Sequence, residues 1–144
     1  MSAEIVALAA DHAGFELKNL LLEAIRERGL TALDLGTHDG RSVDYPDMAG
    51  ALAGALSDGR AARGVLVCGT GIGIGIAANR HRHLRAALCH DVTTASLARR
   101  HNDANVLVLG ARVVGQQVAL DCLRTFLDTG FEGGRHQQRI DKLE

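Results

Sequence analysis

The chain has 144 residues, a length typical of one compact domain, and it is 47% hydrophobic and 23% charged, as in ordinary globular proteins. A formal net charge of −1 argues against nucleic acid or anionic membrane as partner, and 3% aromatic residues without tryptophan argue against base stacking. Three cysteines without a CxxC spacing predict no disulfide framework and no metal site, and no apolar run approaches the ~18–20 residues of a membrane span, so we expect a cytoplasmic protein.

Aliphatic segments alternate with helix-compatible segments along the whole chain. We expect strands at 5–10, 31–35, 64–68, 85–89 and 106–109, and helices at 15–28, 46–56, 72–79, 92–100 and 116–127. This alternation indicates βαβ units and a parallel sheet. The predicted fold is α/β: a single doubly wound, Rossmann-like domain over 1–144, with five parallel strands and helices on both faces. Residues 131–144 form a tail outside that core.

The segment from Val65 to Asn79 carries the densest chemical signal. A strand ends at Cys68, glycines alternate from Gly69 to Gly75, and a helix follows. The unpaired N–H groups at such a helix start attract negative charge, and glycine lets a ligand approach the backbone closely. A thiol beside this loop is favoured as thiolate. The pattern therefore predicts a base or nucleophile next to an anion site.

Better-known glycine loops do not fit this segment. The third glycine of GxGxxG falls on Ile76, and no GK[ST] follows, so dinucleotide and P-loop signatures are missing. A Cys-x5-Arg phosphatase loop would need arginine where Ile74 stands. Packing alone remains an alternative explanation for Cys68.

Ligands of open α/β sheets bind beyond the carboxyl ends of the strands. Asp11 and His12 follow the first strand, residues 37–45 the second, and Cys68 ends the third. Asp11 is also suited to cap the next helix. His101 lies at the far end of a helix about 15 Å long, too far to meet Cys68 in one subunit. Either His101 is structural or a second subunit completes the site.

Basic residues in the tail favour a phosphorylated ligand. Arg135 and Arg139 are four residues apart, so a short helix would place both guanidinium groups on one face, and Arg112 is a candidate third cation. The alternative is a solvated helical face.

These motifs together resemble the type B ribose-5-phosphate isomerases, whose wider family includes galactose-6-phosphate isomerase subunits. The resemblance covers essentially the whole chain in the family's order. It rests on six segments: ADHAG at 10–14, DYP at 44–46, CGTGIG at 68–73 with AAN at 77–79, RHNDAN at 100–105, GARVVG at 110–115 and EGGRHQQR at 132–139.

The resemblance implies interconversion of ribose 5-phosphate and ribulose 5-phosphate through a cis-enediolate, without metal or organic cofactor. It implies that Cys68 is the base, that the 69–73 backbone with Thr70 holds the oxyanion, and that His101, helped by Asp11, opens the sugar ring. The substrate-binding residues would be Asp11, His12, Tyr45, Gly69, Thr70, Gly71, Ile72, Gly73, Asn102, Arg112, Arg135 and Arg139.

The resemblance also implies a homodimer whose active sites lie at the subunit interface; assembly into a tetramer stays open. Some family members use a glutamate in the glycine loop as base, and here Gly75 stands in that region, which indicates the cysteine subtype. Two alternatives remain: an isomerase of a six-carbon phosphate (allose 6-phosphate or galactose 6-phosphate) and a non-catalytic sugar-phosphate-binding subunit.

Overall fold

The computed structural model describes residues 3–143, so Met1, Ser2 and Glu144 of the predicted domain lie outside the described residues. The strands are β1 (Ile5–Ala10), β2 (Thr31–Asp34), β3 (Arg63–Cys68), β4 (Ala86–Leu88) and β5 (Val106–Gly110). The helices are α1 (Phe15–Glu27), α2 (Tyr45–Ser57), α3 (Ile72–Ala78), α4 (Val92–Asn102), α5 (Gln116–Asp128) and α6 (Arg135–Ile140). No helix among these residues is long and apolar enough to cross a membrane.

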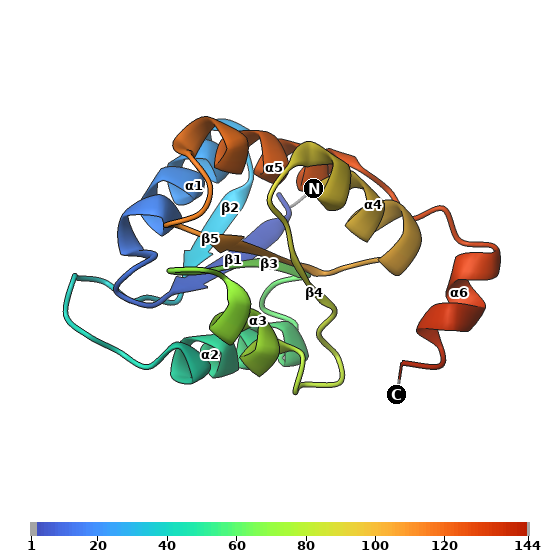
Figure 1. Ribbon diagram of the computed structural model, residues 1–144, viewed down its shortest axis with the longest axis horizontal. Coiled ribbons are helices and arrows are strands. Elements are labelled where there is room, and N and C mark those ends of the chain that lie inside the picture. Colours follow the sequence, from blue (N-terminus) through green and yellow to red (C-terminus); the bar gives the residue numbers. More distant parts are fainter. Residues whose placement is uncertain (1–2, 144) are drawn as a thin grey trace.

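The five strands form one parallel sheet in the order β2-β1-β3-β5-β4. Helices α1, α4 and α5 cover one face, and α2 and α3 cover the other (Figure 1). The predicted doubly wound α/β fold with five parallel strands is therefore confirmed.

The central strands are apolar throughout because helices cover both faces of the sheet. In β3, Val65 and Val67 pack under α1 and α5, whereas Leu66 and Cys68 point to the layer of α2 and α3. The sulfur of Cys68 therefore belongs to the α2/α3 side of the sheet.

The chain reverses its direction of winding between β1 and β3. From β1 it crosses to β2 at one edge, and from β3 it moves toward β5 and β4 at the other. The carboxyl ends of β1 and β3 stay adjacent, because the Asp11 N–H donates to the Val67 carbonyl at 3.2 Å. This is the point where open α/β sheets form a binding crevice.

Two glycines allow the loop after β3 to lie close to β5. Gly71 adopts φ 79°, and a Cβ there would lie 2.5 Å from Leu88 Cδ1. A Cβ on Gly110 would lie 2.4 Å from the Thr70 carbonyl oxygen. Larger residues would push the loop off the sheet.

A buried cation fixes the loop after β2. Lys18 on α1 is completely buried, and its Nζ donates to Asp34 Oδ1 at 2.7 Å and to the Thr37 carbonyl at 2.8 Å. Burial by itself would raise the pKa of Asp34, but the hydrogen bonds from Lys18 Nζ and from the Gly36 N–H hold it below its usual value. The buried ammonium group is thus paired, as burial of a charge requires.

The structure differs from the expected elements mainly at the β4 edge and at the end of α4. β4 is two residues shorter than predicted, since the Arg85 N–H is bonded by the Asn105 side chain. α4 continues past Arg100 until Asp103, whose left-handed conformation (φ 46°) ends it. The predicted short tail helix is α6, which stands away from the sheet (Figure 1).

Two of the cysteines are core residues. Cys89 and Cys122 pack in the layer of α1, α4 and α5, and burial raises the pKa of each thiol to about 11. Their thiolates are therefore scarce near neutral pH.

We expect iodoacetamide at about pH 8 to alkylate Cys68 before Cys89 and Cys122 in the folded protein. At a pKa of about 11 only about one thiol in a thousand is ionised, and the thiolate is the nucleophile. Peptide mass mapping over time would measure this order, with the urea-unfolded chain as the control in which all three react. Early labelling of either core thiol would contradict the assignment.

Candidate functional site

Cys68 lies at the carboxyl end of β3 with its sulfur already hydrogen-bonded. Its Sγ accepts the Gly71 N–H at 3.1 Å, and the residue is 5% exposed. The left-handed Gly71 turns the chain back so that its own N–H meets the sulfur. The contact therefore fixes the position of the sulfur relative to the glycine loop.

The loop beyond Cys68 presents backbone donors. The first three N–H groups of α3, those of Ile72, Gly73 and Ile74, have no acceptor within the helix, whereas the Gly75 N–H bonds the Gly71 carbonyl. Thr70 Oγ1 accepts the first of them, from Ile72, at 3.2 Å. The Gly73 and Ile74 groups can serve an oxygen anion at this end of the helix.

Arg112 brings a positive charge to the same loop. It follows β5, and its N–H donates to the Gly69 carbonyl at 2.9 Å. Its guanidinium folds over Gly69, where Nη1 would lie 3.4 Å from an added Cβ. This arginine therefore complements the backbone donors as an anion-binding group.

Asp11 and His12 extend the site on the β1 side. Asp11 Oδ1 accepts the N–H groups of Ala13 and Gly14 at 3.0 and 3.2 Å, which closes a turn before α1 and leaves Oδ2 for other contacts. The predicted cap on α1 is wrong, because Gly14 is the N-cap of that helix and no side chain among the described residues bonds its first N–H groups. His12 Nδ1 accepts the Val43 N–H at 3.2 Å. This bond places the proton of a neutral ring on Nε2, which becomes a donor.

Tyr45 closes the group on the α2 side. Its ring packs over Gly73, where an added Cβ would lie 2.7 Å from Tyr45 Cζ, and 41% of the residue is exposed. We call the residues assembled here the carboxyl-edge group: Asp11, His12, Tyr45, Cys68 to Gly73, and Arg112.

The other predicted residues lie at the opposite edge of the sheet. His101 and Asn102 end α4. Nearby in the chain, the Asn105 carbonyl accepts the N–H of Gly64, which lies at the amino end of β3. Cys68 pairs with Gly110 at the far end of the same two strands. An eleven-residue helix is about 16 Å long, so His101 and Cys68 of one chain do not meet.

The tail folds against the end of α4 and surrounds His101. The Glu132 N–H donates to the Arg100 carbonyl at 3.0 Å, and Arg100 Nε donates to Glu132 Oε2 at 2.6 Å. The rings of His101 and His136 stack with centroids 4.3 Å apart and planes tilted by 15°. Glu132 Oε1 lies 3.8 Å from His101 Nε2 and 3.6 Å from His136 Nε2. Asn102 adjoins this cluster in the chain.

The charges of this cluster follow from its surroundings. The hydrogen bond from Arg100 lowers the pKa of Glu132, which stays ionised. Burial, followed by the nearby charge of His101, lowers the pKa of His136, which is therefore neutral near pH 7. His136 Nε2 is buried and has no hydrogen-bond partner among residues 3–143. Such an orphaned nitrogen calls for an explanation.

Arg135 and Arg139 both lie exposed on α6, four residues apart, as the spacing predicted. Helix α6 lies beyond the end of α4 (Figure 1), whereas Arg112 follows β5 at the carboxyl edge. A single chain therefore does not gather the three arginines around one ligand.

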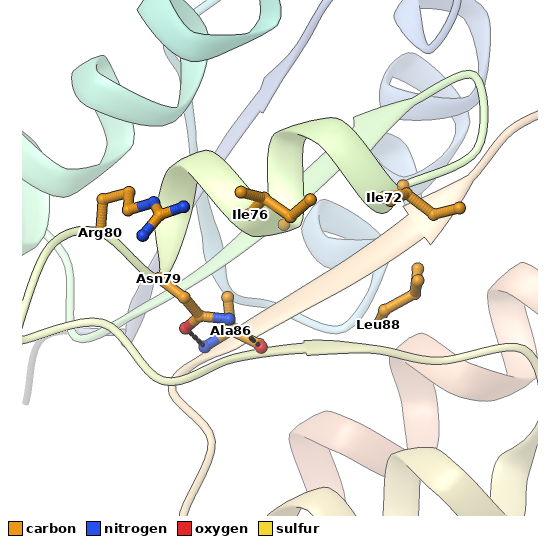
Figure 2. A pocket seen from close by; sticks show the side chains of 8 residues that line it. Ile72, Ile76, Asn79, Arg80, Ala86 and Leu88 are labelled. Carbon is orange, nitrogen blue, oxygen red and sulfur yellow. Dashed lines mark hydrogen bonds between the residues drawn. The ribbon is translucent and has the colours of Figure 1, made fainter. Parts of the chain in front are cut away.

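Two hollows border the edge strand β4. One of about 370 Å³ lies between α3 and β4, where Figure 2 shows Ile72, Ile76 and Leu88 around it and the Asn79 amide bonded in both directions to the Ala86 backbone. A second, of about 780 Å³, shares Asn79 and Ala86 and runs toward Asn102 and α6. Ile72 and Ile76 are each more than half exposed. The smaller, more apolar hollow is thus the one beside the glycine loop, along β4.

Sequence reasoning missed Glu132 and His136 as members of a cluster. Their spacing of four residues was the available signal, but their partner His101 lies more than thirty residues earlier in the chain. Only the packing of the tail on α4 brings the three side chains together.

Comparisons with known proteins identify the family of the chain. A family model described as ribose/galactose isomerase matches residues 6–143. The chain is 43% identical over 138 residues to ribose-5-phosphate isomerase B of Escherichia coli, covering 96% of this chain and 93% of the relative. It is 42% identical over 139 residues to D-erythrulose-4-phosphate isomerase of Pectobacterium atrosepticum, covering 96% of this chain and 91% of the relative.

A solved structure confirms the likeness at the level of the fold. The crystal structure of a ribose 5-phosphate isomerase from Thermotoga maritima matches with a TM-score of 0.95 at 46% identity, covering 97% of each chain. Sequence and structure agree over nearly the whole length. The chain therefore belongs to the ribose/galactose isomerase family and is an isomerase.

Proposed function

We propose that the protein interconverts ribose 5-phosphate and ribulose 5-phosphate without a metal or organic cofactor. The observation that carries the proposal is the Cys68 sulfur, 3.1 Å from the Gly71 N–H, at the winding reversal of the sheet and beside the N–H groups that begin α3. Aldose–ketose isomerisation needs a base for a carbon-bound proton and donors for the oxyanion that develops. The carboxyl-edge group supplies both.

The proposed reaction has two stages. His101, helped by Asp11, protonates the ring oxygen and opens the furanose. The Cys68 thiolate then takes the proton from C2 and returns it to C1, while the proton of the hydroxyl at C2 moves to the oxygen at C1, through a cis-enediolate. Backbone N–H groups of 69–73, with Thr70, stabilise the enediolate oxygens.

The remaining assigned residues position the substrate. His12, Arg112, Arg135 and Arg139 bind the phosphate and hydroxyls, Asn102 contacts the sugar, and Tyr45 borders the pocket. Tail residues 131–144 belong to the same single domain in this proposal and serve as its substrate-binding arm; Glu144 lies outside the described residues.

The proposed unit is a homodimer. His101 and Cys68 lie at opposite edges of one chain, so a two-fold pair of chains is the simplest way to bring one of each together. The hollows beside β4, with Ile72 and Ile76 exposed next to them, offer a surface for the second copy. The arginines of α6 would then reach the partner's carboxyl-edge group. A tetramer of two such dimers stays open.

Replacing Cys68 with alanine should abolish turnover of ribose 5-phosphate, a loss of at least about 10²–10⁴-fold in kcat, because the base is removed. Binding of a pentose phosphate should be nearly unchanged, since the backbone donors and Arg112 remain. Isomerisation would be followed in EDTA, and calorimetry would give the affinity.

Cys89→Ala is the matched control, because it removes a buried thiol away from the loop. Circular dichroism would establish that both variants fold. Full activity of Cys68→Ala would refute the role of this thiol, and a wild-type chain that binds but never turns over would favour the non-catalytic subunit.

The substrate class is tested by comparing chain lengths. We expect kcat/KM to be highest for ribose 5-phosphate and at least about tenfold lower for allose 6-phosphate and galactose 6-phosphate, because the phosphate site sets the distance to Cys68. Erythrose 4-phosphate belongs in the same series, since the Pectobacterium atrosepticum relative is named for a four-carbon substrate. A preference for six or four carbons would reassign the substrate and leave the isomerase chemistry intact.

Mixing two inactive variants tests whether sites are shared between chains. In a heterodimer of Cys68→Ala and His101→Ala, one site carries both substitutions and the other carries neither. Random reassociation makes half of the dimers mixed, so activity should recover to about a quarter of wild type. Size-exclusion chromatography with light scattering would establish the dimer. Without recovery in a proven heterodimer, both residues would act within one chain or not at all.

A further inference from the structure

The cluster of His101, Glu132 and His136 has the composition of a metal site. Its two ring nitrogens and one carboxylate oxygen all lie within 4.8 Å of one another. His136 is 7% exposed, and its Nε2 is the buried nitrogen without a partner among residues 3–143. That nitrogen faces Glu132 Oε1 at 3.6 Å, which is too long for a hydrogen bond. A cation bound by these three atoms would give the buried His136 nitrogen the partner that it lacks.

We infer that His101, Glu132 and His136 form a binding site for a divalent transition metal ion of the Zn²⁺ class. The inference shares His101 with the proposed function, in which no metal takes part, and none of the comparisons assigns a metal to these residues.

The distances are close to those of a zinc centre. Zinc binds nitrogen and oxygen at about 2.0–2.2 Å in tetrahedral geometry, which puts two ligand atoms roughly 3.3 Å apart. Glu132 Oε1 lies 3.6 Å from one ring nitrogen and 3.8 Å from the other. Movements of a few tenths of an ångström in this carboxylate would bring both of these distances to that value, and a fourth position would remain for water.

One ring must turn to admit the ion. Both imidazoles are stacked, so their in-plane lone pairs do not converge as they stand. The side chain of His101 is 37% exposed and can rotate, whereas the side chain of His136 is 9% exposed and is held by its surroundings. Metal binding should therefore unstack the pair by moving His101.

The surroundings favour one class of ion. Two imidazoles with one carboxylate suit Zn²⁺, Co²⁺, Ni²⁺ or Cu²⁺, whereas Mg²⁺ and Ca²⁺ prefer oxygen donors. Arg100 holds Glu132 Oε2 at 2.6 Å and leaves Oε1 directed at the histidines, as an outer-shell partner orients a ligand. Arg135 and Arg139 on α6 oppose the ion's charge, so we expect binding weaker than at a structural zinc site.

The test is metal binding by the full chain, without a histidine tag and after dialysis against EDTA. Calorimetry with ZnCl₂ should give one ion per chain, and Co²⁺ should give visible absorption bands typical of four-coordinate nitrogen and oxygen ligation. His136→Phe keeps a ring to stack on His101 and removes the ligand nitrogen. It should weaken Zn²⁺ binding at least about tenfold, and Glu132→Gln, at a largely solvated position, should do the same without disturbing the core.

Two control variants separate this site from others. His81→Phe removes a histidine from the surface pair His81 and His83, whose ring centroids lie 6.1 Å apart, and should leave Zn²⁺ binding unchanged. Cys68→Ala should also leave it unchanged, since the thiol is no member of the cluster. Equal affinity in wild type, His136→Phe and Glu132→Gln, loss of binding in Cys68→Ala or His81→Phe, or no binding by the wild-type chain would each overturn the inference.

Discussion

The turn at Gly71 is the constraint on which the carboxyl edge depends. Its left-handed conformation brings one N–H onto the Cys68 sulfur and starts α3 with its free N–H groups facing the same space. The turn is possible because Gly71 and Gly110 carry no side chains where loop, β4 and β5 meet. The sulfur and the N–H groups proposed to bind the oxyanion therefore come from one stretch of backbone. A thiol on a longer loop would lack this fixed relation to its anion site.

The sheet explains why the chemistry is divided. Strands of a parallel sheet all end at one edge, so the residues that follow β1, β3 and β5 lie close together there. Helix α4 runs back along the sheet and delivers His101 to the other edge. The same geometry that assembles Cys68 and Arg112 thus removes His101 from them. In the proposed homodimer, the two-fold axis brings His101 of one chain close to Cys68 and Arg112 of the other.

Much of this arrangement follows from local patterns. The apolar runs locate β1, β3 and β5 to within a residue, and the glycine spacing locates the turn that holds Cys68. The cluster at His101 could not be found that way, because it depends on the tail returning to the end of α4 through the contact between Glu132 and Arg100. The left-handed Asp103 that ends α4 was missed for a related reason: its conformation is supported by Arg85 and Arg99, which are bonded to it across turns and strands.

Lys18 has a consequence for His12, at the same edge of the sheet. Its buried ammonium ties the loop after β2 to α1 through Thr37 and Asp34, and the same loop supplies the Val43 N–H that holds the His12 ring. The buried ammonium group therefore helps to fix the loop whose Val43 N–H orients the His12 ring. A ligand arriving at His12 meets a preorganised donor, and less conformational entropy is lost on binding.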